Sequence, residues 1–449
     1  MHKSPGASRK RKSSELGSKL AGEGEECRAL QAPHREAIPA IQAERLDATQ
    51  FWAEFVSRRR PVVIKGHPKD PEWRASQLWS LDYLRSKAGE CVIKVEYRAD
   101  KNGSYGQGRR IKMTFREFLD KVEAGNDTLY FTAQQTSVGA DGFLELYGAP
   151  LTSVPNDFGL TPSLLPNLVP QQMNLWIGAA REGASSGLHH DFHDNLYILL
   201  RGVKKFRLYP PSLASQMYTN GAIHKIYPNG RIVYEGQGDV LADGSDAQDV
   251  ALWREHQEAC AALAAEEDAV GRKGSEKRLK MAEDRLEETL EHMLDGVAED
   301  WPEGPGADCN SSDEGDEEEE GEEADILEDG TEPDSFSKVD LSLPYDRIRE
   351  KFPQFPDQSS MLECEVHRGE MLFLPAGWFH DVTSVGDGES GWHMAFNYWF
   401  YPPDNLEPSR SGFSAPYASG YWPSVWKERA HQADGRQCGG HDVSTASLA

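Results

Sequence analysis

The amino-acid sequence predicts a mainly β protein with flanking helices, and three observations carry that expectation. Two apolar ribbons, residues 196–200 and 204–209, stand on either side of Gly202 in the middle of the chain. Further runs of large apolar and aromatic residues follow at 371–374 and 394–400. Helical spacing of apolar residues marks the region before residue 126 and one interior segment. The turn at Gly202 predicts that the first two ribbons pair as an antiparallel hairpin.

The N-terminal part of the chain is expected to mix helices and strands after a disordered tail. Residues 1–37 are rich in Ser, Gly, Lys and Glu, a composition typical of disorder. Asp47 and Thr114 precede apolar residues at helical spacing and are candidate N-caps. The expected elements are helices over 47–56, from residue 79 and over 112–119, with strands at 60–66 and 91–97.

The rest of the chain is expected to consist of further strands, interrupted by one inserted helical segment. Strands are expected near 127–131 and 174–178, with a peripheral hairpin around Asn229 and Gly230. The composition then becomes rich in Ala, Glu, Leu and Lys, which predicts two helices over 246–270 and 275–297. We expect one amphipathic face of these helices to pack on the barrel or on its partner helix rather than to form a separate binding module. Trp422 and Trp426 indicate a packed C-terminal segment.

A metal site is suggested by His189 and Asp191, which share one face if this stretch is extended. An imidazole and a carboxylate are two parts of a 2-His-1-carboxylate triad, which suits non-haem Fe(II) and O2. This pair alone is weak evidence, because a surface His beside a solvated Asp has the same pattern. His380 follows a strand-like run and a turn at 375–377, and we interpret it as the third ligand. His190 and His193 are left outside the metal ligands.

These motifs together resemble the Jumonji-C (JmjC) hydroxylases of the 2-oxoglutarate and Fe(II) oxygenase superfamily. The shared patterns are NLWIG (174–178), His-x-Asp-x-x-x-Asn-Leu-Tyr (189–197), Gly-x-Lys (202–204), GEMLFLPAGWFH (369–380) and NYWF (397–400). The chain is most similar to the bifunctional peptidase and lysyl-hydroxylase branch, and the asparaginyl hydroxylase that inhibits hypoxia-inducible factor is a more distant relative. The similarity covers roughly residues 51–403, interrupted by one large insertion.

The resemblance implies a double-stranded β-helix, the cupin or jelly-roll barrel, and it divides the chain accordingly. The expected parts are a disordered basic tail (1–37), an N-terminal α/β region (38–126), the first half of the JmjC barrel (127–245), a helical insertion (246–298), an acidic disordered tract (299–337), the second half of the barrel (338–403) and a C-terminal segment and tail (404–449).

The resemblance also implies roles for single residues. His189, Asp191 and His380 would bind Fe(II) and form the catalytic centre, with 2-oxoglutarate as cosubstrate and O2 as co-reactant. A buried distal carboxylate of 2-oxoglutarate needs a cation, because an unpaired buried charge is costly. Lys204 stands where the family supplies that cation, and Lys205 is expected on the opposite face.

Four more positions match the 2-oxoglutarate pocket of the family. Tyr130 and Ser186 would donate hydroxyl groups to the distal carboxylate, and Asn195 and Asn397 would position the cosubstrate or the iron-bound carboxylates. Each has a simpler interpretation: a core aromatic for Tyr130, a loop residue for Ser186, and turn or strand-edge residues for the two asparagines. Trp399 could be a pocket wall, but we interpret it as core.

Charge and cysteine content limit the functional classes. The formal net charge is −26, and residues 308–334 alone carry 15 acidic residues, which leaves about −11 for the rest. This balance argues against broad nucleic-acid binding, which depends on Lys and Arg neutralising phosphates. The six cysteines are scattered without Cys-x-x-Cys spacing, which indicates reduced thiols in the cytosol or nucleus and no structural zinc. No apolar run is long enough to span a membrane. Residues 9–12 are either a nuclear import signal or part of a solvated tail.

We therefore expect hydroxylation of a protein side chain, with lysine as the residue that the resemblance implies. An acidic surface would suit a basic protein or peptide, and a homodimer remains open. Two alternatives stay open beside this one. The same chemistry could remove a methyl group from N-methyl-lysine in histones, or the chain could be a non-catalytic cupin-like scaffold that binds basic proteins. His190, residues 192–194 and Asp381 depart from the lysyl-hydroxylase branch, which puts the choice of substrate in doubt.

Overall fold

The computed structural model describes residues 37–98, 109–139, 143–267, 327–328, 333–389 and 391–438, together with residues 278, 280–282 and 285. The basic tail with its candidate nuclear signal, most of the second predicted insertion helix and most of the acidic tract lie outside these residues.

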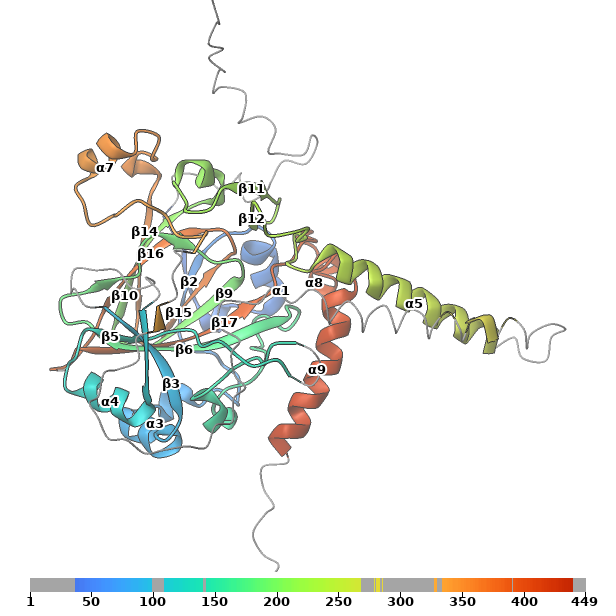
Figure 1. Cartoon of the computed structure of the whole chain (residues 1–449), viewed down its shortest axis with the longest axis horizontal. Coiled ribbons are helices and arrows are strands. Elements are labelled where there is room, and N and C mark those ends of the chain that lie inside the picture. Colours follow the sequence, from blue (N-terminus) through green and yellow to red (C-terminus); the bar gives the residue numbers. More distant parts are fainter. Residues whose placement is uncertain are drawn as a thin grey trace, which may run out of the picture.

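Most of the described strands belong to one large and one small sheet that face each other (Figure 1), and β11 and β12 form a separate pair. The large sheet runs in the order β1 (Ala40–Gln42), β2 (Val62–Lys65), β15 (Glu370–Leu374), β9 (Asp194–Arg201), β17 (Trp392–Phe400), β6 (Pro170–Ala179), β5 (Leu129–Phe131), β3 (Val92–Tyr97), β4 (Arg109–Thr114) and β13 (Leu327–Glu328). The small sheet contains β14 (Leu362–His367), β10 (Val203–Tyr209), β16 (Phe379–Val385), β7 (Ala184–Ser185) and β8 (His189–His190). Two facing sheets with strands from both halves of the chain are the predicted double-stranded β-helix.

Apolar side chains from both sheets fill the space between them. Tyr197 and Leu199 of β9 pack with Phe206 and Leu208 of β10 in one buried cluster. A larger cluster lies on the outer face of the large sheet, where it includes Leu196 and Ile198 of the same strand. Alternate residues of β9 therefore serve two cores, which explains why residues 194–200 are all buried.

The predicted hairpin at Gly202 is wrong in its pairing, although both strands exist. β9 pairs with β15 and β17 in the large sheet, whereas β10 pairs with β14 and β16 in the small one. Gly202 has φ +84°, and a Cβ there would lie 2.6 Å from the carbonyl oxygen of Val385. The turn thus carries the chain from one sheet to the other, a barrel corner that a single sequence does not distinguish from a hairpin.

The N-terminal helices form near the expected places and cover the outer face of the large sheet, although residues 112–114 belong to β4 and not to the third helix. Asp47 caps α1 (Ala48–Phe51), which continues as a π-helical turn (Trp52–Val56), and Ser80 caps α3 (Leu81–Ala88). Thr114 and Glu117 form a capping box on α4 (Phe115–Glu123). The strands of this region, β1 to β4, join the same sheet as the barrel strands. The other short helices are η2 (Ala43–Arg45), α2 (Ala75–Leu78), η4 (Leu151–Ser153), η5 (Pro155–Asp157), η6 (Pro211–Gln216) and η7 (Gln358–Ser360).

The predicted peripheral hairpin is confirmed as β11 (Ile223–Ile226) and β12 (Ile232–Tyr234), with Gly230 at positive φ in the turn. Three further described helices lie outside the insertion: α7 (Tyr345–Lys351), α8 (Arg410–Ser414) and α9 (Tyr421–Cys438). Trp422 of α9 stacks on Tyr401, with ring centroids 3.5 Å apart, so the expected packing of the C-terminal segment is confirmed.

The insertion begins with α5 (Ala247–Glu267), which projects from the body of the molecule beside α9 (Figure 1). Near its start Trp253 packs edge-on against Tyr421 of α9, at 6.1 Å between ring centroids. Further along, Glu258 and Glu266 face Arg285 and Arg278, an antiparallel order that agrees with the predicted helix pair. Within the described residues the insertion packs on its own second helix and on α9, and Val250 and Trp253 near the start of α5 also join the apolar cluster on the outer face of the large sheet.

The end of the predicted acidic tract is part of the barrel. Residues 333–337 were expected to be disordered, but Phe336 forms an antiparallel bridge with His189 of β8. The amide of His190 donates to the carbonyl oxygen of Ser335 (3.2 Å), and the amide of Ser337 donates to that of Leu188 (2.8 Å). This pairing satisfies the backbone of the segment, so the return of the insertion lies directly beside the candidate metal ligands.

Candidate active site

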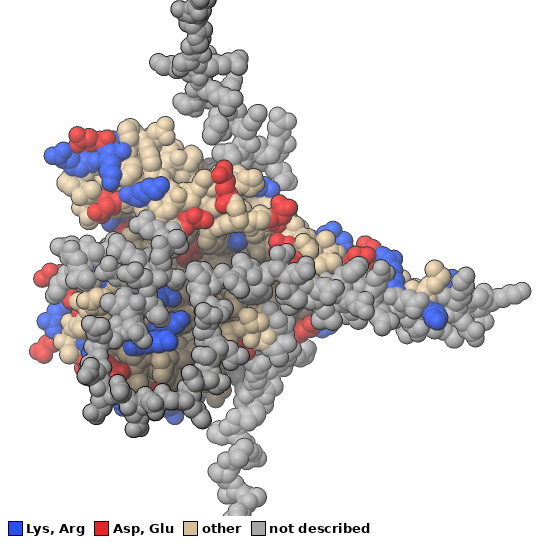
Figure 2. All heavy atoms as spheres, viewed as in Figure 1, with Lys and Arg blue, Asp and Glu red and all other residues tan. Residues whose placement is uncertain are grey.

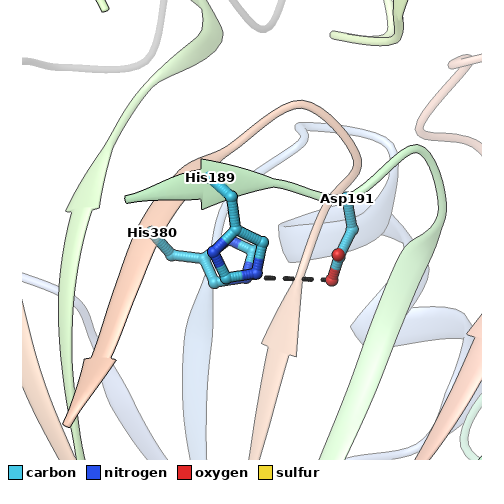
Figure 3. Close-up of side chains that lie close together, drawn as sticks. All are labelled: His189, Asp191 and His380. Atoms are coloured by element: carbon cyan, nitrogen blue, oxygen red, sulfur yellow. Dashed lines mark ion pairs between the residues drawn. The ribbon is translucent and has the colours of Figure 1, made fainter. Parts of the chain in front are cut away.

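Three side chains from two strands and one loop converge at the end of the small sheet (Figure 3). His189 lies on β8 and His380 on β16, and the two residues are neighbours in the β8–β16 pairing. Asp191 lies one residue beyond the end of β8, so it is not on the strand that the sequence predicted. It reaches the same point because the chain turns back there, and its carbonyl oxygen accepts from the amide of Gly377 (3.0 Å).

The geometry fits one shared metal ion. One ligand atom from each residue lies within 4.8 Å of the others, and Nε2 of His380 is 3.8 Å from Oδ2 of Asp191. Nδ1 of His189 donates to the carbonyl oxygen of Gly187, and Nδ1 of His380 donates to that of Trp378, both at 2.9 Å. These bonds fix the tautomer of each ring and leave Nε2 free to coordinate. Two imidazoles and one carboxylate with open positions are the donor set that non-haem Fe(II) takes.

The electrostatics favour the protonation states that a metal requires at two of these residues, His189 and Asp191. Burial, reinforced by the neighbouring His380, lowers the pKa of His189 to about 4. Burial alone would raise the pKa of Asp191, but the imidazoles of His380 and His189 outweigh it and the net shift is downward. At neutral pH the site therefore offers a neutral His189 and an ionised carboxylate.

Both predicted asparagines act on Asp191 through a chain of hydrogen bonds. Nδ2 of Asn195 donates to Oδ2 of Asp191 (3.3 Å), and Nδ2 of Asn397 donates to Oδ1 of Asn195 (3.1 Å). The indole Nε1 of Trp176 donates to Oδ1 of Asn397 (2.8 Å) and ends the chain. Each amide is held at both ends, so the Asp191 carboxylate is oriented by a fixed, buried network.

Lys204 lies in the same cavity as the three candidate ligands, at the end formed by Tyr130 and Ser384. Its side chain is 1% exposed, and its Nζ donates to the hydroxyl groups of Tyr130 (3.3 Å) and Ser384. No described acidic side chain forms an ion pair with it, and burial lowers its pKa from 10.5 to about 7. Lys205, in contrast, is half exposed and pairs with Glu365, as strand alternation predicted. A buried ammonium held only by hydroxyl groups has no counter-ion among the described side chains, and a small carboxylate could supply one.

Three further residues near the cavity have roles or positions that differ from the prediction or were not predicted. Ser186 lines the cavity, and its hydroxyl group donates to the carbonyl oxygen of Gly187 and accepts from the amide of Val382. Trp399 is a wall of the cavity and not plain core. Ser384 was missed by the sequence reasoning, although strand alternation from His380 would have placed it on the inner face.

Two neighbouring histidines make other contacts and are not part of the candidate metal group. Nε2 of His190 is bonded to the hydroxyl group of Tyr234 (2.7 Å), and the ring of His193 stacks on Trp399. The open side of His189 is covered by Phe336, whose ring lies parallel to the imidazole at 4.7 Å between centroids. This aromatic wall could not be found from the sequence, because it belongs to the end of an acidic tract.

Comparison with known proteins extends these findings. The family model described as a cupin-like domain matches residues 48–406. The chain is 34% identical over 440 residues to JmjC domain-containing protein 4 of Schizosaccharomyces pombe, which covers 89% of this chain and 90% of that protein. Bifunctional peptidase and (3S)-lysyl hydroxylase JMJD7 of Homo sapiens is 28% identical over 205 residues, or 42% of this chain and 60% of that protein. Lysine-specific demethylase JMJ32 of Arabidopsis thaliana is 22% identical over 392 residues, or 82% of this chain and 84% of that protein.

Proposed function

The chain belongs to the cupin-like JmjC family, and from that premise we propose that it is an Fe(II)- and 2-oxoglutarate-dependent oxygenase that hydroxylates a lysyl side chain of a protein. The observation that carries the proposal is one cavity with a 2-His-1-carboxylate set at one end and a buried lysine at the other. The name of the human relative supports lysine as the target residue.

In this proposal each residue binds or orients a reactant. His189, Asp191 and His380 hold Fe(II) and leave positions for the keto acid and O2. Lys204, with Tyr130 and Ser384, binds the distal carboxylate of 2-oxoglutarate, and Ser186 lines the same cavity. Asn195 and Asn397 keep Asp191 in its coordinating orientation. The bound metal and cosubstrate supply the oxidation itself, in which one oxygen atom of O2 enters a C–H bond and the other enters succinate as CO2 leaves.

A second candidate reaction has its own support. A relative that covers 82% of this chain is named a lysine-specific demethylase. Oxidation of an N-methyl group gives a hemiaminal that releases formaldehyde, so the same cavity would serve both reactions. The described cavity walls, Trp176 and Trp399 among them, do not distinguish a methylated from an unmethylated lysine.

The test is mass spectrometry of extract proteins and lysine peptides incubated with Fe(II), 2-oxoglutarate and either the wild-type chain or the His189→Ala variant. We expect a +16 Da product on unmethylated lysine with the wild type only. Formaldehyde from methylated peptides without that product would support the demethylase. If no substrate stimulates succinate formation in either case, the enzymatic proposal is wrong and a non-catalytic scaffold becomes the better interpretation.

A further inference from the structure

A buried ion pair joins the loop after Asp191 to the turn before His380. The side chains of Arg59 and Asp194 are both 0% exposed and form a two-point pair. Oδ1 of Asp194 also accepts from the amide of Ala376 (2.9 Å). Asp194 is three residues past Asp191, and Ala376 is four residues before His380, so one carboxylate touches both segments that carry these ligands.

The other side of Arg59 reaches His380 by a second route. The carbonyl oxygen of Arg59 accepts from the indole Nε1 of Trp378 (3.1 Å). The carbonyl oxygen of Trp378 in turn accepts from Nδ1 of His380 (2.9 Å). The backbone of Arg59 therefore holds Trp378, the residue whose carbonyl group sets the tautomer and ring orientation of the candidate ligand His380.

The conformation of Arg59 is held from several directions. Its φ is +54°, in the left-handed region that a bulky side chain seldom adopts. Nε donates to the carbonyl oxygen of Asn229 (2.8 Å), while the two terminal nitrogens bind Asp194. The planar guanidinium thus donates to three acceptors in a fixed geometry. The ammonium group of a lysine could not reproduce this arrangement.

The turn at residues 375–378 is pressed against a second turn on its far side. Gly377 has φ +78°, and a Cβ there would lie 1.9 Å from the carbonyl oxygen of Gly230. Its amide donates to the carbonyl oxygen of Asp191, as described above. Contacts to Asp191, Asp194 and Arg59 therefore fix this turn, and through it the place where His380 enters the site.

We propose that the Arg59–Asp194 ion pair, acting through Trp378 and the turn at 375–378, is the positioning element that sets the spacing of Asp191 and His380 and hence the metal affinity of the site. The inference rests on the proposed metal centre. It assigns a role in metal binding to a residue that is 130 positions from the nearest candidate ligand and touches none of the three.

The experiment measures Mn(II) binding by electron paramagnetic resonance titration, since Mn(II) prefers the ligands of Fe(II) but is stable in air. The key variant is Trp378→Phe, which removes one indole N–H and keeps an aromatic ring in the core. Its matched control is Trp52→Phe, because Trp52 is 1% exposed and donates its indole N–H to the carbonyl oxygen of Glu407 (2.8 Å), away from the site. Arg59→Lys is the second variant, and thermal unfolding of the metal-free protein is recorded for all of them.

We expect Trp378→Phe and Arg59→Lys to weaken Mn(II) binding about tenfold, the lower end of the effect of an outer-shell change, because the carbonyl group that holds His380 remains but loses its support. Trp52→Phe should lower the unfolding temperature about as much as Trp378→Phe while its Mn(II) affinity stays within about twofold of the wild type. The positioning role is overturned if Trp378→Phe binds Mn(II) like the wild type, or if the Trp52 control weakens binding equally. If the wild type does not bind Mn(II), or if its Mn(II) binding does not depend on His189, the proposed metal centre is wrong. This inference then fails with it.

Discussion

Lys204 shows how a single buried residue can make cosubstrate binding depend on pH. Its pKa in the free protein is lowered to about 7 by burial, with Tyr130, Ser384 and the buried His393 as its polar neighbours. A bound carboxylate favours the charged ammonium and raises that pKa again. Binding of 2-oxoglutarate must therefore recruit a proton when the pH exceeds about 7.

The expected result is a Kd for 2-oxoglutarate that is flat below pH 7 and rises up to about tenfold per pH unit above it. Calorimetric titration of the Mn(II)-loaded protein between pH 6 and 9 would measure this. Lys204→Arg is the control, because a guanidinium stays charged throughout and should flatten the profile even if affinity falls. A wild-type profile without this rise would show that Lys204 is not the group that receives the carboxylate.

At the scale of single residues, the sequence predicted those positions that motif spacing and side-chain chemistry determine. The offset of Lys204 from His189 and Gly202 was enough to reverse the usual expectation of a solvated lysine, and its near-complete burial agrees. Ser384 was missed because its partner Lys204 lies 180 residues away in the sequence, and strand alternation from His380 indicates the face of Ser384 but not that partner. The ring of Phe336 over His189 was missed for the same reason.

Helices and turns were predicted well because local sequence signals determine them. The arrangement of the strands was predicted less well because it depends on pairing between distant segments. The N-cap at Thr114 and the turn at Gly230 rest on neighbouring residues, and both are confirmed. The two ribbons around Gly202 were predicted as strands correctly but paired wrongly, because a barrel corner and a hairpin use the same turn residue. Which sheet receives each strand depends on partners such as β15 and β16, far away in the sequence.

The corner at Gly202 should be intolerant of any side chain. Gly202→Ala places a Cβ 2.6 Å from a carbonyl oxygen and 2.9 Å from Cβ of His393, in addition to the cost of positive φ. We expect a loss of about 3 kcal/mol or more in the free energy of unfolding, from strain and clash together.

Denaturant unfolding of Gly202→Ala beside Gly236→Ala would separate these two causes. Gly236 has φ +89°, but the Cβ that alanine adds there would have no atom within 4 Å, so this variant carries only the conformational cost, about 1 kcal/mol. Equal losses in the two variants would mean that the close approach at the corner is relieved by small shifts.

For the whole molecule, charge is divided between the folded body and the insertion. Figure 2 shows Lys and Arg interspersed with Asp and Glu over the visible described surface, with Lys and Arg gathered around α7. The acidic excess is instead concentrated in sequence, because 15 acidic residues fall within 308–334. The tract rejoins the barrel at residues 333–337, beside His189. No described helix is long and apolar enough to cross a membrane.

This arrangement predicts that the tract attracts basic substrates to the site. In residues 308–326 eleven side chains are acidic, and replacing them by Asn and Gln leaves the described contacts of Glu328 and Asp334 in place. Attraction between opposite charges raises association rates and weakens with salt. We therefore expect kcat/KM for a Lys- and Arg-rich peptide to fall several-fold at low ionic strength, with kcat unchanged, and the difference to vanish near 0.5 M salt, where screening acts within about 4 Å. A peptide with one lysine and no net charge is the control, and an equal loss for both peptides would show that the tract acts on the site itself rather than on substrate capture.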